Sequence, residues 1–425
     1  MILLLVSLVV LLVIGVPIAY SLGISGFLYF ALIHPELLPI LPQRLFAGME
    51  SYAMVALPLF ILMGLLMNAG GITTRLIDFS LLFVGRMRGG LGLVNVLASM
   101  IFGGISGSSV SDTASVGAVL IPEMKRKGYT SRFASGITVA SSTMGMIIPP
   151  SVPMVVYALV AEESVGRLFL GSAIPGIMIG LLMLVITFVI SVKRKYPTEE
   201  IRLTAKEKFD RVKRALLAII MPVFVIGSVV LGIATATESA SIGVFYAFII
   251  GFFVFRSMKL KQIPPLLRQA ILTSAAVMII IALSKLYIWI LAIERVPQTV
   301  AMAVAALNLP PFVILLLINL IILAAGTFID VSPAILLLTP VFLPAAVNLG
   351  IDPVQFGVIL ISGLAVGLVT PPVGMCLNVA SAISKLEIGA IFKGALPFLM
   401  ANIVTLILIT YIPQLTLWLP SILMK

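Results

Sequence analysis

Long runs of apolar residues, separated by short gaps that hold most of the charge, set the strongest limit on how this chain can fold. Hydrophobic residues make up 61% of its 425 residues, and charged residues make up only 10%. A soluble globular domain is about 45–50% apolar and about 25% charged. So much apolar surface cannot be hidden in one soluble core, and lipid must solvate the rest. The sequence therefore predicts an all-α polytopic membrane protein.

The basic residues lie in the gaps between the apolar runs, where the positive-inside rule puts cytoplasmic charge. This arrangement explains the net charge of +11 without a nucleic-acid partner. Four basic clusters are expected in the cytoplasm, at residues 86–88, 125–132, 193–214 and 256–268. The first apolar run has no basic residue before it and no evident cleavage site, so we expect a retained first span that starts outside.

Most of the apolar runs are interpreted as segments that cross the bilayer once. A straight crossing needs about 20 residues, and a shorter run makes a short span. The expected crossing segments are residues 2–16, 18–33, 52–71, 133–161, 169–192, 216–235, 239–255 and 270–293.

Two further runs cannot cross once and are predicted to be re-entrant helical hairpins. Residues 89–122 have a basic cluster on both sides, so the segment must enter and leave on the cytoplasmic face. Half of it is shorter than the about 20 residues of a full span, and its Gly- and Ser-rich centre, residues 103–109, is a poor helix former. Residues 312–346 repeat this arrangement from the other side, with a break at residues 326–333.

A proline pair follows each hairpin, at residues 149–150 and 371–372. Proline removes a backbone donor and clashes with the preceding turn. The segments 133–161 and 353–384 are therefore predicted to be broken helices, each made of two half-helices around an unwound stretch.

The equal spacing of these features predicts an inverted repeat. The two proline pairs lie 222 residues apart, and the hairpin centres are offset by about the same amount. Residues 1–192 form the first repeat, residues 193–214 a basic cytoplasmic linker, and residues 215–425 the second repeat. Interrupted segments at matching positions of inverted halves indicate the central site of a secondary transporter.

The hairpin tips and the broken helices are expected to meet near the middle of the membrane, where free carbonyls and hydroxyls can bind a small cation. All these groups are hard oxygen ligands, which suit Na⁺ and not a transition metal. The alternative interpretation is that small residues here only allow close helix packing. The candidate cation ligands are Ser106, Ser108, Ser109, Gly145 and Ile148 in the first half, and Gly326, Thr327, Gly367 and Thr370 in the second.

An anionic substrate is expected at the same place, because half-helix N-termini present amide donors and a positive dipole end. Arg295 could pair with a substrate carboxylate, or it could neutralise Glu294. Lys285 could also pair with the substrate, or it could extend its charged end to the membrane interface. The candidate substrate contacts are Ser106, Ser151, Arg295, Asp330 and Asn378.

Two acidic residues lie within the hairpins, and an ionisable residue inside a membrane segment is a functional hypothesis by default. Each could instead cap the N-terminus of its half-helix. We interpret Asp112 as a cap and Asp330 as part of the site. The single cysteine, Cys376, and the single histidine, His34, leave no set of soft ligands for a resident metal or a disulfide.

The stretches 103–112, 121–124, 146–152 and 368–375 resemble the large membrane subunit of tripartite ATP-independent periplasmic (TRAP) transporters. The resemblance covers nearly the whole chain. It implies Na⁺-driven uptake of a small organic anion by an elevator mechanism in the inner membrane of a bacterium or archaeon. The substrates of this family are mostly carboxylates, such as C4-dicarboxylates, sialic acids and other sugar acids. Lys285 stands where the family is expected to have a small or apolar residue.

The resemblance also implies two protein partners, a smaller four-helix membrane subunit and a periplasmic substrate-binding protein. It implies no enzymatic activity and no cofactor apart from Na⁺ as coupling ion. One alternative is a stand-alone Na⁺/dicarboxylate symporter of the same architecture. Another is an intramembrane serine protease built on the Gly-Ile-Ser-Gly string at residues 104–107, which lacks a nearby basic side chain.

Overall fold

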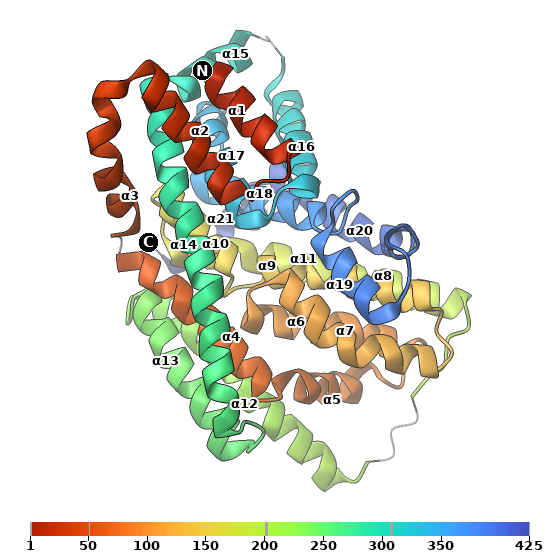
Figure 1. The fold of residues 1–425 in the computed structure, drawn as a ribbon. Helices are drawn as coiled ribbons and strands as arrows, with labels where there is room; N and C mark the ends of the chain where they lie inside the picture. Colours follow the sequence, from red (N-terminus) through yellow and green to blue (C-terminus); the bar gives the residue numbers. More distant parts are fainter. Residues whose placement is uncertain (1, 51, 200–202, 307–308, 425) are drawn as a thin grey trace.

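The computed structural model describes residues 2–50, 52–199, 203–306 and 309–424, and in these ranges the chain is helical without strands (Figure 1). Seven helices are long and apolar enough to cross a membrane, or up to nine if each of two bent helix pairs counts as one span. Many of their apolar side chains are exposed, for example Val185 (60%), Phe245 (68%) and Ile271 (64%). A lipid-facing surface explains this exposure, and the predicted class of all-α polytopic membrane protein is confirmed.

The helices outside the hairpins and broken segments form the frame of the molecule. Four of them, α11, α12, α14 and α20, are 24 to 31 residues long. The frame consists of α1 (Ile2–Val13), α2 (Ile18–Ile33), α3 (Leu41–Met49), α4 (Ala56–Ala69), α5 (Ile72–Val84), α11 (Val165–Lys193), α12 (Ala205–Val230), α13 (Ala236–Ile249), α14 (Ile263–Ile293), α15 (Val296–Ala306), α20 (Ile388–Tyr411) and α21 (Gln414–Leu423).

Short turns of helix complete the frame. The 3₁₀ turns are η1 (Pro35–Ile40), η2 (Tyr52–Val55) and η4 (Leu260–Gln262), and η3 (Ile250–Val254) is a π-helical turn that extends α13.

Several helix ends differ from the boundaries expected from hydropathy. The helix α12 begins at Ala205, inside the basic stretch 193–214, because Thr204 and Glu207 form a capping box there. A capped helix can start in a charged segment that a hydropathy boundary assigns to a linker. The helix α4 ends at Ala69, close to the expected boundary at residue 71, but a further helix, α5, follows it at an angle of 66°. The helix α1 has only 12 residues, fewer than a straight span needs.

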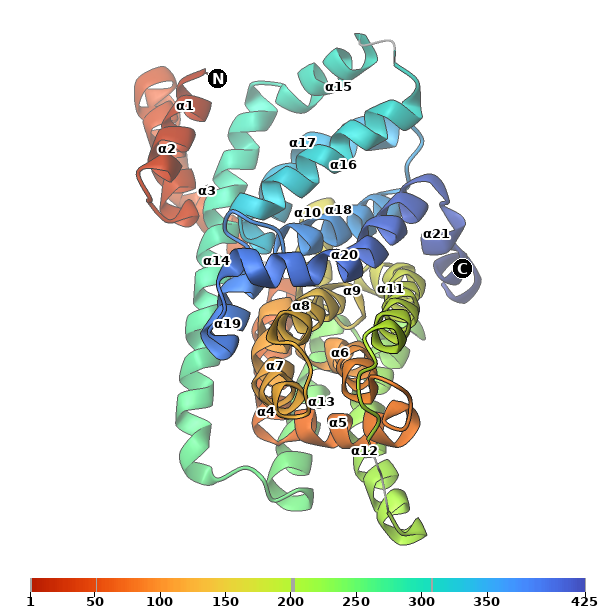
Figure 2. The same ribbon diagram turned by 90° about the vertical axis from the view of Figure 1, so that its right-hand side faces the viewer.

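The first two helices form a small body of their own against α14. Leu22, Tyr29 and Phe30 of α2 pack with Leu286 and Ile290 of α14 in a hydrophobic cluster separate from the main core. Figure 2 shows α1 and α2 beside α14, and Leu337 and Val341 of residues 331–348 also pack against this cluster.

The first expected hairpin consists of α6 (Gly90–Ser106) and α7 (Ser109–Arg126). The outer ends of both helices contact the same segment, residues 196–199. The Gly89 backbone N–H, just before α6, donates to the Pro197 carbonyl at 3.0 Å. Just after α7, the Lys127 ammonium pairs with Glu199 at 2.9 Å. The chain therefore enters and leaves this hairpin at one end of the molecule.

The second expected hairpin consists of α16 (Pro311–Phe328) and α17 (Val331–Asn348). Ile329 and Asp330 join the two helices, which run back alongside each other (Figure 2). Each helix has 18 residues and is apolar enough to count as a candidate span by length and composition.

Both segments with a proline pair are interrupted helices. The first consists of α8 (Ser131–Ser142), α9 (Met144–Ile147) and α10 (Val152–Ala161), with a bend of 42° at the proline pair. The second consists of α18 (Pro353–Gly367) and α19 (Met375–Ser384), with an irregular stretch between them. Both Pro-Pro peptide bonds are cis.

The hairpins and the interrupted helices of the two halves pack reciprocally. The second arm of the first hairpin, α7, lies against α19 of the second interrupted helix. The second arm of the second hairpin, α17, lies against α10 of the first interrupted helix. The largest hydrophobic core includes residues of all four elements.

Candidate cation and substrate site

The first hairpin tip is a tight turn between α6 and α7. Gly107 closes α6 in the left-handed region, with φ +62°, and an added Cβ there would lie 3.1 Å from the Val152 backbone nitrogen. Ser108 is extended and caps α7, since its hydroxyl accepts the Ser111 N–H at 3.5 Å. A glycine is thus required at position 107, both by the positive φ and by the close approach of the chain that follows the proline pair.

Asp112 lies behind this tip and is completely buried. Its Oδ1 accepts the Ser106 hydroxyl, whereas its Oδ2 has no hydrogen-bond partner in the described part of the chain. The Ser109 hydroxyl is also buried and without a partner there. The interpretation of Asp112 as a helix cap is wrong, because Ser108 fills that role and Asp112 lies one turn further on.

The carboxylate of Asp112 packs against the backbone of Gly145 in α9. A Cβ at Gly145 would lie 2.2 Å from Asp112 Oδ2, and a Cβ at Gly103 would lie 3.1 Å from the Gly145 backbone. Ser106, Asp112 and Gly145 therefore meet at one point, and Ser109 lies three residues before Asp112 in α7. Ser108 adjoins them through its backbone N–H, which donates to Ser106 Oγ at 3.2 Å.

Two further predicted residues lie at the first proline pair. Ile148 ends α9, with its N–H bonded to the Met144 carbonyl at 2.8 Å and an extended backbone that leaves the helix. Ser151 is buried, and its hydroxyl donates to the Met146 carbonyl at 2.5 Å. This bond bridges the unwound stretch and holds it against the end of α9.

The second tip repeats the contact between hairpin and interrupted helix. A Cβ at Gly367 would lie 2.3 Å from the Gly326 carbonyl carbon, so the two backbones touch. The Val373 N–H, just after the second proline pair, donates to the Thr327 carbonyl at 3.3 Å. The Thr370 hydroxyl donates to Val366 within its own helix end at 2.8 Å. Gly326, Thr327, Gly367 and Thr370 thus belong to one neighbourhood.

Asp330 and Asn378 lie at the edge of this second neighbourhood and are exposed. Asp330 caps α17, since its carboxylate accepts the Val331 N–H at 2.7 Å. The Asn378 side chain donates to the Val373 carbonyl at 2.9 Å. Capping and a role in the site are compatible for Asp330, because a carboxylate has more acceptor positions than the cap uses.

Cys376, at the start of α19, lies between the two neighbourhoods. Its buried thiol lies near the hydroxyls of Thr113 and Ser142. Thr113 Oγ1 donates to Ser142 Oγ at 2.7 Å, linking α7 to α8. We did not predict these residues as part of the site. Their only sequence signal is that they are small and polar inside apolar segments.

The two basic candidates stand apart from the tips. Arg295 is exposed at the start of α15, with φ +52°, and its guanidinium makes no ion pair with any described residue. Lys285 is half-buried within α14 and likewise has no hydrogen bond or ion pair in the described ranges. No described contact joins either residue to the hairpin tips.

The first neighbourhood has the chemistry of a site for a small hard cation. A buried carboxylate oxygen and a buried hydroxyl without partners are costly, and a bound cation would satisfy both. The oxygens available are hydroxyls, carbonyls and one carboxylate, which suit Na⁺. Among the described residues, no three His, Cys, Asp or Glu side chains are close enough to hold a metal ion together.

The fold and this site define a class, that of polytopic membrane proteins with interrupted helices and polar groups buried between them. A model of the family described as "Tripartite ATP-independent periplasmic transporter, DctM component" matches residues 5–415. The chain belongs to this family and is a TRAP transporter large permease subunit. Membership favours the tripartite system over a stand-alone symporter, and a transporter over an intramembrane protease.

Known relatives are similar in sequence to this chain over nearly its full length. The C4-dicarboxylate TRAP transporter large permease protein DctM of Pseudomonas aeruginosa is 40% identical, over 94% of this chain and 94% of its own. The sialic acid TRAP transporter large permease protein SiaM of Vibrio cholerae is 36% identical, over 96% and 95%. The isethionate TRAP transporter permease protein DctMQ of Oleidesulfovibrio alaskensis is 36% identical, over 96% of this chain and 64% of its own.

Solved structures share the fold at low sequence identity. The Alcanivorax borkumensis YdaH transporter superposes with a TM-score of 0.64 at 15% identity, over 89% of each chain. Neisseria gonorrhoeae MtrF superposes with a TM-score of 0.62 at 15% identity, over 91% of this chain and 84% of that one.

Proposed function

We propose that this permease subunit imports a small organic anion, that Na⁺ is the coupling ion, and that the protein works by an elevator movement. The observation that carries the proposal is the buried, partly unpartnered set of oxygens at the first hairpin tip, Asp112 Oδ2 and Ser109 Oγ, beside Gly145. A cation bound there would satisfy both oxygens. Ser106, Ser108, Ser109, Gly145 and Asp112 would hold one Na⁺, and Gly326, Thr327, Gly367 and Thr370 a second.

The matching contacts of the two tips support an inverted repeat. Gly103 touches Gly145 in the first half, and Gly326 touches Gly367 in the second half. The offsets between equivalent partners are 223 and 222 residues, close to the spacing of the proline pairs. The hairpins and the interrupted helices, packed reciprocally, would form the transport domain of the elevator, and the long frame helices would form the scaffold.

The names of the relatives suggest the substrate class. They specify C4-dicarboxylate, sialic acid and isethionate, which are small anions with a carboxylate or a sulfonate. Ser106, Ser151 and Asn378, with the N-terminal amides of α10 and α19, would contact such a group. Bound Na⁺ would offset the substrate charge, so binding of the two would be coupled. Arg295 would contact the substrate only if the elevator movement brings α15 toward the site.

The coupling energy would come from the Na⁺ gradient and the membrane potential. Moving one net charge inward is worth about 2.3 kcal/mol per 100 mV. The protein would lie in a bacterial inner membrane with a small four-helix membrane subunit and a periplasmic substrate-binding protein. The fused relatives DctMQ and SiaT, of which this chain covers 64% and 66%, support the small-subunit partner, because their extra length leaves room for it.

Reconstitution into liposomes with the small subunit and the binding protein tests this function. We expect uptake of a C4-dicarboxylate, a sialic acid or isethionate when Na⁺ is present outside, and loss of uptake when choline replaces it. Uptake that is unchanged in choline would overturn the Na⁺ coupling. A panel of organic acids with no uptake at all would overturn the substrate class.

A further inference from the structure

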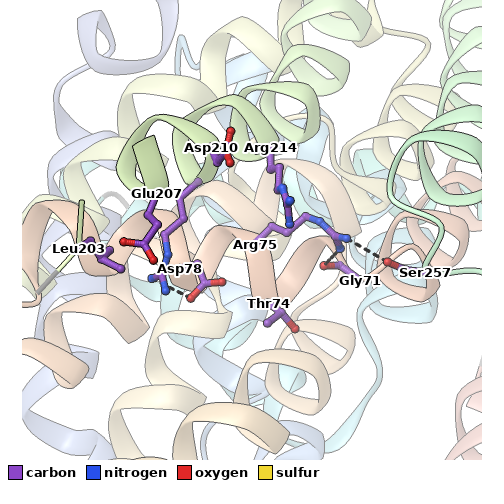
Figure 3. A pocket seen from close by; sticks show the side chains of 10 residues that line it. Gly71, Thr74, Arg75, Asp78, Leu203, Glu207, Asp210, Arg214 and Ser257 are labelled. Carbon is purple, nitrogen blue, oxygen red and sulfur yellow. Dashed lines mark hydrogen bonds and ion pairs between the residues drawn. The ribbon is translucent and has the colours of Figure 1, made fainter. Parts of the chain in front are cut away.

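A cavity of about 570 Å³ opens between α5, the first turns of α12 and the segment after α13 (Figure 3). It lies far along the chain from both hairpin tips and shares no residue with the candidate cation site. Two of the three segments that form it belong to basic clusters, residues 193–214 and 256–268, which the positive-inside rule puts in the cytoplasm.

Three arginines and three acidic residues line the cavity, and one of these acidic residues is in an ion pair. Asp78 pairs with Arg211 at 3.1 Å. Glu207 accepts the N–H and the hydroxyl of Thr204, each at 2.8 Å, in the capping box of α12. Two guanidiniums, Arg75 and Arg214, are left with Asp210 as the remaining carboxylate.

Arg75 is held in place by neutral groups alone. Its Nη1 donates to the Gly70 and Gly71 carbonyls at 3.1 and 2.7 Å, and its Nη2 donates to the Ser257 hydroxyl at 3.0 Å. The guanidinium also lies 3.9 Å from the centre of the Phe255 ring. These contacts fix its position but do not neutralise its charge.

Arg214 points toward Arg75 across the cavity (Figure 3), close enough for the two charges to repel each other. It makes no hydrogen bond or ion pair within the described ranges, and neither does Asp210. An anion placed between two facing guanidiniums would offset their repulsion. A phosphate group matches this geometry, since guanidiniums bind phosphate oxygens with paired hydrogen bonds.

An adjoining cavity of about 300 Å³ extends the charged one toward the apolar surface. It shares Arg75, Asp210 and Arg214 with the first cavity, adds Lys213, and is also lined by Leu217, Val254 and Phe255. Beside it, exposed apolar side chains continue along α12 and the turn after α13: Leu216 (48%), Ile220 (49%), Phe253 (61%) and Val254 (50%). A ligand that fits both parts has an anionic head and an apolar tail.

We propose that this pair of cavities binds the phosphate headgroup of an anionic phospholipid of the cytoplasmic leaflet. Arg75, Arg214 and Lys213 contact the phosphate, and the acyl chains lie along the apolar side chains of α12 and of the turn after α13. Basic pockets between membrane helices on the cytoplasmic side are typical sites for such headgroups. The lipid joins α5, α12 and the end of α13, which also meet here through the Asp78–Arg211 ion pair and the hydrogen bond from Arg75 to Ser257.

Lipid binding is measured on the purified full chain by native mass spectrometry and by thermal unfolding, with added phosphatidylglycerol or phosphatidylcholine. We expect phosphatidylglycerol to be retained and to raise the unfolding temperature, and phosphatidylcholine to do neither. The affinity for phosphatidylglycerol should fall about fivefold in R214Q and at least about tenfold in R75Q/R214Q. R214Q keeps the contacts of Arg75, so it tests the site even if the double variant is unstable.

Two controls make the test specific. The variant K206Q/K208Q removes two charges from exposed positions of the same helix outside the cavity and should bind as the wild type does. D210N removes the remaining carboxylate and should strengthen binding. Equal binding by wild type and R214Q would overturn the site. A thermal shift with inorganic phosphate but none with phosphatidylglycerol would keep the phosphate chemistry and overturn the lipid as its source.

Discussion

At the scale of single residues, Asp112 has the most demanding environment in the candidate site. It is fully buried, one carboxylate oxygen is bonded to Ser106, and the other has no partner among the described residues. Leaving a charged oxygen unsatisfied at this depth would be strongly unfavourable. A bound cation, as proposed above, would remove that cost.

The substitution Asp112→Asn tests this role. The amide keeps the volume of the side chain but removes the negative charge, so the Na⁺ concentration for half-maximal uptake should rise at least about tenfold, a loss of about 1.4 kcal/mol. Glu387→Gln is the matched control, because Glu387 is exposed before α20 and its side chain caps nothing. An unchanged Na⁺ dependence in D112N would remove Asp112 from the site.

At the scale of elements, the contact between each hairpin and its interrupted helix depends on glycine. Gly326 and Gly367 bring α16 and α18 into backbone contact, as Gly103 and Gly145 do for α6 and α9. Small residues allow membrane helices to approach this closely. The packing interpretation and the functional interpretation of these glycines are therefore compatible, because the close approach is what brings the tip to the unwound stretch.

The substitution Gly367→Ala should separate these two helices. Its Cβ would lie 2.3 Å from the Gly326 carbonyl carbon, so the backbone must shift, and overpacking of this kind costs about 1–3 kcal/mol. We expect a lower unfolding temperature in detergent and loss of most uptake. Gly389→Ala is the control, since nothing lies within 4 Å of its added Cβ. Identical behaviour of the two variants would contradict the backbone contact.

A tyrosine hydroxyl forms a hydrogen bond between the two interrupted helices. Tyr157 of α10 donates a hydrogen bond to the Pro353 carbonyl at the start of α18, at 2.6 Å. Tyr157→Phe removes only this bond and should lower the free energy of unfolding by about 1 kcal/mol. Tyr20→Phe provides the comparison, because Tyr20 is exposed and has no hydrogen bond in the described part. Thermal or denaturant unfolding of both variants measures the difference, and equal stability would contradict the link.

At the scale of the whole molecule, the topology follows from where the hairpins open. Both ends of the first hairpin contact residues 196–199, which places its entry and its exit together. If this end faces the cytoplasm, as the basic clusters predict, the segment 89–122 cannot cross the membrane completely.

Thiol labelling in a Cys376→Ser background measures this topology. Arg88→Cys and Lys127→Cys place exposed thiols at the two outer ends of the first hairpin. A membrane-impermeant maleimide should label both in inside-out vesicles and neither in intact cells whose outer membrane is permeabilised. Labelling of the two positions from opposite sides would show a full crossing and contradict the inverted repeat.

The features that depend on local properties of the chain could be predicted from the sequence. The run 18–33 forms α2 with the expected ends, and helix breaks occur at the Gly-Ser tip and at both proline pairs. The start of α12 was missed, because the capping box of Thr204 and Glu207 outweighs the charge of the segment. The interpretation of Asp112 as a cap was wrong, because Ser108 caps α7, whereas Asp330 caps α17 and its role in the site stays a prediction.

The sequence by itself determined the class of the protein, the interrupted segments and the neighbourhoods of the candidate ligands, because apolar run length, proline and glycine act on the backbone where they stand. Only the tertiary structure decided which groups face each other. It places the Asp112 carboxylate against the Gly145 backbone, Cys376 beside Thr113, and Arg214 opposite Arg75. Each of these contacts joins residues of separate helices. The packing of the helices, and not a local preference of the chain, therefore determines which residues lie together.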